Sequence, residues 1–273
     1  MMKIRNLEQE SDRYMEKIIF DAHAHYNDEI FREQEQKNII EYVFENGVRY
    51  ILNAGTNIES SKESIALAEK YDGVYAVVGF YPHDCIDIKD NDAAEHELRE
   101  MLKHPKVVGI GEIGLDYHYD DTRKEMQKIW FEKQLDIAEE LDVPVVIHDR
   151  EAHGDIVEIL KKHPKARGML HSFSGSKETA EELLKLGWYI SISGVVTFKN
   201  AVKMLDVVKV VPDDRLLIET DSPYLAPVPN RGKVNNSANL IYTAGKIAEI
   251  KGISVEDVCN MTRKNACKLF GIN

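Results

Sequence analysis

The sequence contains few cysteines, and their arrangement excludes a disulfide-based scaffold. Only Cys85, Cys259 and Cys267 occur among 273 residues, and no two of them form a CxxC pair. An odd number of dispersed cysteines is typical of a reducing compartment. Residues 1–20 also contain no apolar core of roughly 7–15 residues, so they do not predict a secretory signal peptide. We therefore expect a cytoplasmic protein.

Long apolar runs and blocks of basic residues are absent as well. No run approaches the roughly 18 apolar residues that a transmembrane helix requires, so no membrane association is expected. The formal net charge is −12, which argues against tight, sequence-independent wrapping of DNA, because such binding depends on cations that neutralise phosphates. A nucleic-acid substrate is not excluded, since bound divalent ions would supply positive charge locally.

The sequence also lacks a linker rich in proline or glycine, an internal repeat and a low-complexity segment. One domain is therefore the simplest organisation, and 273 residues is a usual length for one α/β barrel. We expect residues 1–17 to form a polar N-terminal extension without an assignable role. Residues 18–273 are expected to form the single domain.

Short runs rich in β-branched residues alternate along the chain with longer helical patterns. This order predicts a parallel sheet with crossover helices, and eight such units predict a TIM (β/α)₈ barrel. The expected strands are Ile18–Ala22, Arg49–Asn53, Val74–Val78, Val107–Ile110, Pro144–Ile147, Arg167–Leu170, Trp188–Ile192 and Leu216–Ile218.

Three helices are predicted with defined ends. The spacing of apolar residues predicts a helix over Lys124–Leu141, with Thr122 and Glu125 in a capping-box pattern. Two further helices are expected after the last strand, over Ser237–Ile250 and Val255–Phe270. Before the second of these, Ser254 and Asp257 have the same capping pattern as the first helix.

Histidines and acids follow five of the eight expected strands. Residues two apart on a strand point to one face, so His23 and His25 are able to direct two imidazoles at one ion. Taken alone, this pair favours a metal ion over a pair of structural histidines, whereas each remaining candidate is a weaker signal. Those candidates, each at the carboxyl side of another expected strand, are Glu112, His148, His171 and Asp221.

The joint placement of these six residues predicts a metal centre. Active sites of α/β barrels lie at the carboxyl ends of the strands, and buried charges are costly unless they are paired or bound to metal. Imidazoles with carboxylates suit Zn, Mn, Fe or Ni, and less exclusively Mg. We expect two divalent ions and no organic cofactor. His23, His25 and Asp221 are assigned to one ion, His148 and His171 to the other, and Glu112 to both. Asp221 is the expected catalytic base and Glu112 the catalytic bridge between the ions.

From about Ile18 to the C-terminus, the sequence resembles the TatD-type deoxyribonucleases. The resemblance implies a TIM barrel of the metallo-dependent hydrolase (amidohydrolase-like) type, the same six ligands, and metal-dependent hydrolysis of DNA, often as a 3′→5′ exonuclease. Single-stranded DNA or DNA ends are the expected substrate. The matching motifs are FDAHAH at 20–25, GEIGLDY at 111–117, PVVIHDR at 144–150, HSFSGS at 171–176 and ETDSPYLAP at 219–227.

Two segments depart from the family pattern. Tyr81 stands where family members commonly have histidine, although His83 is retained, and Val234 and Asn236 replace a common arginine and glutamate. Both departures fall in loops that we expect to contact substrate. The residues expected to contact substrate are Tyr81, His83, Arg150, Ser172, Arg231 and Lys233.

Two other readings of the same residues stay open. One is an amide or ester hydrolase of the wider amidohydrolase type, such as a D-aminoacyl-tRNA deacylase. In those barrels a modified lysine at the fourth strand often bridges the metals, whereas Val107–Leu115 contains no lysine and offers Glu112 instead. The other is a non-enzymatic barrel that keeps metal only for structure, which an open cleft with a spare acid disfavours.

Overall fold

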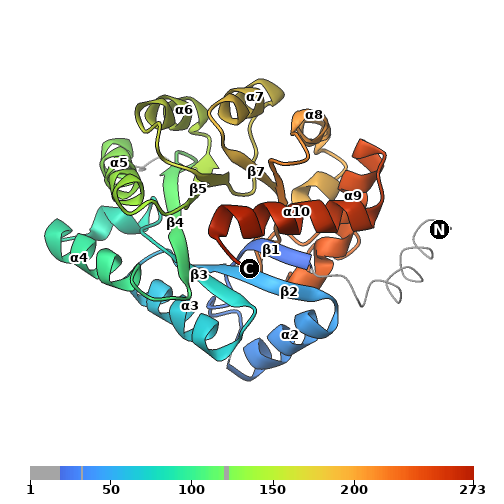
Figure 1. The fold of residues 1–273 in the computed structure, drawn as a ribbon, viewed down its shortest axis with the longest axis horizontal. Coiled ribbons are helices and arrows are strands. Elements are labelled where there is room, and N and C mark those ends of the chain that lie inside the picture. The colour runs from blue at the N-terminus through green and yellow to red at the C-terminus, as the bar shows by residue number, and fades with distance from the viewer. Residues whose placement is uncertain (1–18, 32, 120–122) are drawn as a thin grey trace.

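The computed structural model describes residues 19–31, 33–119 and 123–273, so the N-terminal extension lies outside the described residues. Eight parallel strands form one sheet in the order β1 to β8 (Figure 1). A parallel bridge between Ala24 and Ser222 brings the two ends of the sheet together, so the barrel is nearly closed. The strands are β1 Ile19–Ala24, β2 Val48–Ala54, β3 Val74–Val78, β4 Val107–Asp116, β5 Val145–Arg150, β6 Gly168–Leu170, β7 Tyr189–Ile192 and β8 Leu216–Ile218.

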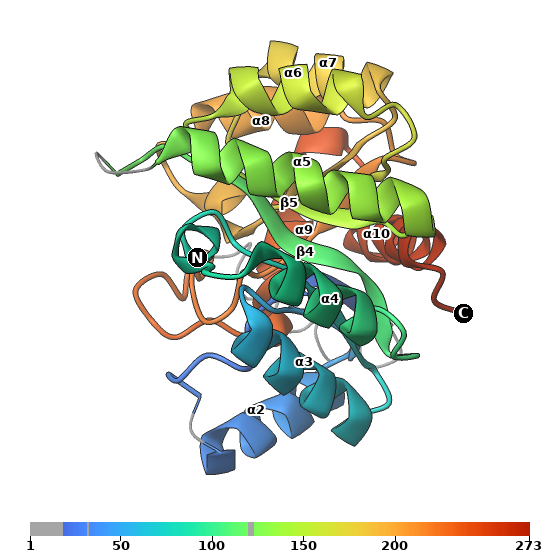
Figure 2. The same ribbon diagram turned by 90° about the vertical axis from the view of Figure 1, so that its left-hand side faces the viewer.

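Helices surround the barrel, and α3, α4 and α5 lie beside one another on its outer surface (Figure 2). Within the part of the chain that the structure describes, three short 3₁₀ helices lie in loops after strands: η2 Asp84–Asp87, η3 Gly194–Thr197 and η4 Ser237–Asn239. The α-helices of the described residues are α2 Glu33–Glu45, α3 Ile58–Lys70, α4 Asn91–Met101, α5 Lys124–Leu141, α6 His153–Lys162, α7 Lys177–Lys185, α8 Val202–Val210, α9 Leu240–Lys251 and α10 Val255–Phe270.

The hydrophobic core has two parts because alternate strand residues face opposite sides of the sheet. One part contains strand residues such as Ile51 and Leu216, together with the inner faces of the surrounding helices. The other contains Leu52, Met169 and Leu217, with residues from the end of α10 packed against them. Buried apolar side chains thus fill the barrel, and polar side chains are left for the carboxyl ends of the strands.

The predicted barrel and its eight strands are confirmed, with differences at the ends. Strands β4 and β5 continue past Ile110 and Ile147, so Glu112 and His148 lie within strands. The parallel pairing of Gly114 with His148 extends both strands toward the carboxyl face. Ile18, the first residue of the first expected strand, lies outside the described residues.

The predicted helix ends are confirmed in part. Ser254 and Asp257 form the capping box that begins α10, and α5 has its predicted bounds. The prediction of one helix over Ser237–Ile250 was wrong at its start, because Ser237–Asn239 form a separate 3₁₀ turn before α9. The predicted cap Thr122 lies outside the described residues. Among the described helices, none is both long and apolar enough to cross a membrane.

Candidate metal centre

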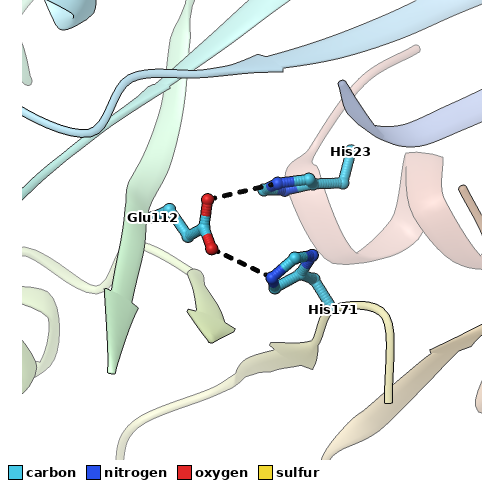
Figure 3. A group of neighbouring side chains, drawn as sticks. All are labelled: His23, Glu112 and His171. Carbon is cyan, nitrogen blue, oxygen red and sulfur yellow. Dashed lines mark ion pairs between the residues drawn. The ribbon is translucent and has the colours of Figure 1, made fainter. Parts of the chain in front are cut away.

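The structure brings the six predicted ligands together at the carboxyl ends of the strands. Figure 3 shows three of them, with His23 and His171 each directed at a different oxygen of Glu112. All six side chains are largely buried, and the most exposed, Asp221, retains 16% of its accessible surface. Three of these residues lie in β1, β4 and β5, and the other three follow β1, β6 and β8, so the barrel closure itself assembles the cluster.

One group of donor atoms combines the Nε2 atoms of two histidines with one oxygen each of Glu112 and Asp221. His23 Nε2 lies 3.0 Å from His25 Nε2 and 3.4 Å from Glu112 Oε2. Asp221 Oδ1 lies 3.7 Å from His23 Nε2 and 3.5 Å from His25 Nε2. Tetrahedral ligands at bond lengths of about 2.1 Å are about 3.4 Å apart, so this donor set fits a divalent cation.

A second group of donor atoms includes the other oxygen of Glu112. Glu112 Oε1 lies 2.8 Å from His148 Nδ1 and 3.0 Å from His171 Nε2, and the two imidazole nitrogens are 3.1 Å apart. His171 also stacks on His23, with ring centroids 4.0 Å apart, so the two groups are in direct contact. Glu112 thus presents one oxygen to each group.

Three of the histidines have a second partner that orients the ring. His148 Nε2 lies 3.2 Å from Asp116 Oδ2, and His171 Nδ1 lies 3.2 Å from Glu219 Oε1. His25 Nδ1 lies 3.1 Å from the carbonyl oxygen of Ala54. Such partners fix the tautomer and leave the other nitrogen free for a metal. Sequence reasoning did not assign this role to Asp116 and Glu219, although both lie in the quoted motifs.

A buried aspartate holds the strand of His23 against the segment of Asp221. Asp21 accepts hydrogen bonds from the backbone N–H of Thr220 at 2.9 Å and from the hydroxyls of Thr220 and Ser237 at 2.5 and 2.6 Å. Burial nevertheless raises the pKa of Asp21 to about 7, because these hydrogen bonds only partly offset desolvation. Asp21 therefore aligns ligands that come from opposite ends of the sequence.

The electrostatics of the cluster favour bound positive charge. Burial alone would raise the pKa of Glu112, but the charge of His171 and hydrogen bonds from His148 and His171 hold it well below its usual range. Burial would lower the pKa of His25, yet hydrogen bonds to Asp221 and Glu112 raise it to about 10. Ionised carboxylates are thus kept in a buried site, where a cation would be strongly attracted.

The residues expected to contact substrate fall into two sets. Tyr81, His83, Arg150 and Ser172 line the cavities that open onto the cluster. The Tyr81 hydroxyl donates to Asp116 Oδ2 at 2.9 Å and lies 3.2 Å from His148 Nε2, so this departure from the family pattern contacts a ligand directly.

The second set lies farther out. Neither Arg231 nor Lys233 is among the described residues that line either cavity. The Arg231 guanidinium lies 4.3 Å from the ring centroid of Phe198, and Lys233 Nζ lies 3.4 Å from Asn230 Oδ1. Val234 is exposed, whereas Asn236 accepts a hydrogen bond from the N–H of Ala238 and caps η4.

Comparison with known proteins decides the family. The family model described as TatD related DNase matches residues 20–271. The chain belongs to the TatD family. It is 42% identical to the uncharacterized metal-dependent hydrolase YabD of Bacillus subtilis, over 94% of this chain and 100% of that protein. It is 37% identical to the uncharacterized metal-dependent hydrolase YcfH of Escherichia coli K12, over 94% and 97% of the two chains.

A solved structure gives the same result. The TatD homologue YJJV of Escherichia coli superposes with a TM-score of 0.87 at 29% identity, covering 95% of this chain and 100% of that one. The TatD relationship and the cluster of histidines and acids agree, and the protein is a metal-dependent hydrolase with the barrel of this family.

Proposed function

We propose that this TatD-family protein is a deoxyribonuclease that hydrolyses phosphodiester bonds at the ends of single-stranded DNA, with two divalent ions. The observation that carries the proposal is the position of Glu112, whose two oxygens each face a separate group of nitrogen donors. A carboxylate in this position is suited to bridge two cations. We assign His23, His25 and Asp221 to one ion and His148 and His171 to the other.

Each residue then has a defined task. Two cations held here would polarise the phosphate and lower the pKa of a water molecule between them. Asp221 is the most exposed carboxylate of the cluster and lines both cavities, so its carboxylate accepts the proton of the attacking water. Burial would raise the pKa of Asp221, but the hydrogen bond from His25 and the charge of His171 lower it. The carboxylate is therefore ionised and ready to accept a proton.

The surroundings of the cluster support a nucleic-acid substrate. Arg150 lines both cavities and supplies a cation for phosphate oxygens. Tyr119 and Tyr224, which line one cavity, are 56% and 47% exposed and offer aromatic faces on which unpaired bases can stack. The description of the matching family model, a TatD related DNase, agrees with this assignment.

An amide or ester hydrolase is the second candidate, because it is the activity typical of the wider class of amidohydrolase-like barrels. β4 provides Glu112 at the bridging position and contains no lysine, which favours the phosphodiesterase. The non-enzymatic barrel is disfavoured because the cluster opens onto two cavities, whereas structural metal sites are closed.

The decisive experiment compares single-stranded DNA with an aminoacyl ester and an amide, in Mg²⁺, Mn²⁺ or Zn²⁺. We expect the wild type to degrade DNA, and Asp221→Asn and Glu112→Gln to lose at least about 100-fold in rate, as is usual when a general base or an electrostatic stabiliser is removed. Asp206→Asn, an exposed residue of α8, is the matched control and should leave the rate unchanged. Turnover of the ester or amide with no DNA cleavage in any metal would overturn the proposal.

A further inference from the structure

Two cavities meet at the metal centre, one among the loops after β5 to β7 and the other among the loops after β1 to β4. Their volumes are about 680 and 780 Å³, each large enough for one nucleotide or more. Both are lined by His148, His171 and Asp221, and by Arg150 at their shared border. A substrate whose scissile bond lies at the cluster must therefore place one side in each cavity.

The first cavity carries the positive charges of Lys203 and Arg150. It lies between the loops after β5 and β6 and the first turn of α8, where Lys203 faces it together with apolar side chains such as Phe173 and Met204. Within the described part of the chain, no carboxylate lies within 4.0 Å of Lys203 Nζ or of the Arg150 guanidinium. Among the described residues of this lining, the acid besides the ligand Asp221 is Asp149, which lies 2.7 Å from His153 Nδ1.

The second cavity carries negative charge and aromatic rings. Apart from the metal ligands, its lining includes the three acids Asp28, Glu63 and Asp84. The Tyr224 hydroxyl donates to Asp28 Oδ2 at 2.6 Å, and Glu63 is exposed with no cation within 4.0 Å among the described residues. A phosphate placed here would meet like charge, whereas an uncharged sugar and base would meet hydrogen-bond acceptors and a stacking surface.

We propose that this charge asymmetry orients the DNA strand, with Lys203 binding a phosphate of the continuing strand in the first cavity. The terminal nucleoside occupies the second cavity. The inference rests on the proposed DNA hydrolysis and adds the orientation of the strand. A terminal nucleotide that ends in a hydroxyl has no phosphate beyond the scissile one. A strand end of this kind therefore brings no further negative charge into the second cavity, whose lining is acidic. The acids Glu63 and Asp84 then select hydroxyl ends against phosphate ends.

Binding without cleavage tests the role of Lys203. A fluorescent single-stranded oligonucleotide is titrated into the full chain carrying Asp221→Asn, in Mg²⁺, at several salt concentrations. Adding Lys203→Gln should weaken binding about three- to tenfold and reduce the slope of log affinity against log salt by about 0.7, the contribution of one phosphate contact in a single strand. Lys203→Arg should restore both values. Lys209→Gln, at the far end of α8, is the matched control and should change neither.

Cleavage of end-modified substrates tests the acidic cavity. When the cleaved end carries a phosphate instead of a hydroxyl, we expect the wild type to hydrolyse the DNA at least about tenfold more slowly. The double variant Glu63→Gln, Asp84→Asn should show a smaller difference in rate between the two kinds of end. Equal rates for the two ends, or a salt slope for Lys203→Gln equal to that of Lys209→Gln, would refute the orientation while DNA hydrolysis stands. Absence of any DNA cleavage by the wild type would refute both proposals.

Discussion

At the scale of single residues, the carboxylates behind the ligands matter as much as the ligands. Asp116 is fully buried and lies within 3.2 Å of His148 Nε2, on the side of the ring away from Glu112. The Tyr81 hydroxyl donates to the same carboxylate oxygen. Removing that negative charge would free the imidazole to rotate and would lower its basicity, so the effect should appear in metal binding.

We expect Asp116→Asn to weaken the binding of a divalent ion about 10- to 100-fold, as removal of outer partners of metal ligands commonly does. Isothermal titration of the metal-free protein with Zn²⁺ or Mn²⁺ measures this change. Asp155→Asn is the control, because Asp155 bonds to Tyr117 and Lys128 outside the cluster. Unchanged affinity in Asp116→Asn would show that packing alone orients His148.

The pKa of His25 predicts how pH affects the metal-free protein. Its folded pKa of about 10 lies above the ordinary value of 6.5, so at neutral pH the ring carries a proton that stabilises the fold. This stabilisation is fully present below pH 6.5 and is lost as pH rises toward 10. We expect the free energy of unfolding of the metal-free protein to fall over that range, as measured by urea denaturation.

The same proton must leave when a cation binds. Titrations in buffers of different ionisation enthalpy should therefore detect proton release at neutral pH, and His25→Ala should release fewer protons. If the wild type and His25→Ala released equal numbers of protons, His25 would not carry a proton in the metal-free protein.

At the scale of elements, two glycines differ in what their surroundings permit. Gly114 in β4 has φ +136°, and a Cβ built there would lie 2.0 Å from the carbonyl oxygen of His148. Gly154 lies in the first turn of α6, and a Cβ there would meet nothing within 4 Å. The close approach of β4 to β5 at Gly114 sets the position of a ligand, whereas Gly154 has no such role.

We expect Gly114→Ala to destabilise the protein by about 1–3 kcal/mol and to weaken metal binding, because a strained conformation and a backbone clash are combined. Gly154→Ala should instead stabilise it by about 0.5–1 kcal/mol, since alanine favours the helix. Chemical denaturation of both variants measures these changes. If Gly154→Ala destabilised the protein as much as Gly114→Ala, the strain and the backbone clash at Gly114 would not explain the loss of stability.

At the scale of the whole molecule, the metal centre joins strands that are distant in the sequence. A cation bound by residues of β1, β4 and the loop after β8 stabilises the folded state and not the unfolded chain. At 100 times its dissociation constant, this contribution is about 2.7 kcal/mol.

We therefore expect chelation to lower the melting temperature by about 4–8 °C in differential scanning calorimetry, and added metal to restore it. Glu112→Gln should respond much less, because it lacks the carboxylate that faces both donor groups. An equal response of this variant would place the stabilising ion elsewhere.

The barrel was predictable from the sequence because its signals are local. β-branched runs and helical spacing identified all eight strands, and the Ser254 capping box marked the start of α10. The six candidate ligands were also predictable, since each follows an apolar strand and parallel strands end at one face. The expected strands end six residues too early in β4 and three too early in β5, so Glu112 and His148 lie within strands instead of after them, but both still lie toward the carboxyl face.

Only the tertiary structure decided which atoms face one another. The two oxygens of Glu112 face different donor groups, and Asp116 and Glu219 orient two of the histidines. These contacts, like the hydrogen bond from Ser237 to Asp21 across 216 residues, join side chains that are distant in the sequence. The charge difference between the two cavities arises in the same way, because Lys203 and Glu63 come from helices on different sides of the barrel. Local sequence patterns record which residues face the carboxyl end, but only closure of the barrel sets their mutual distances.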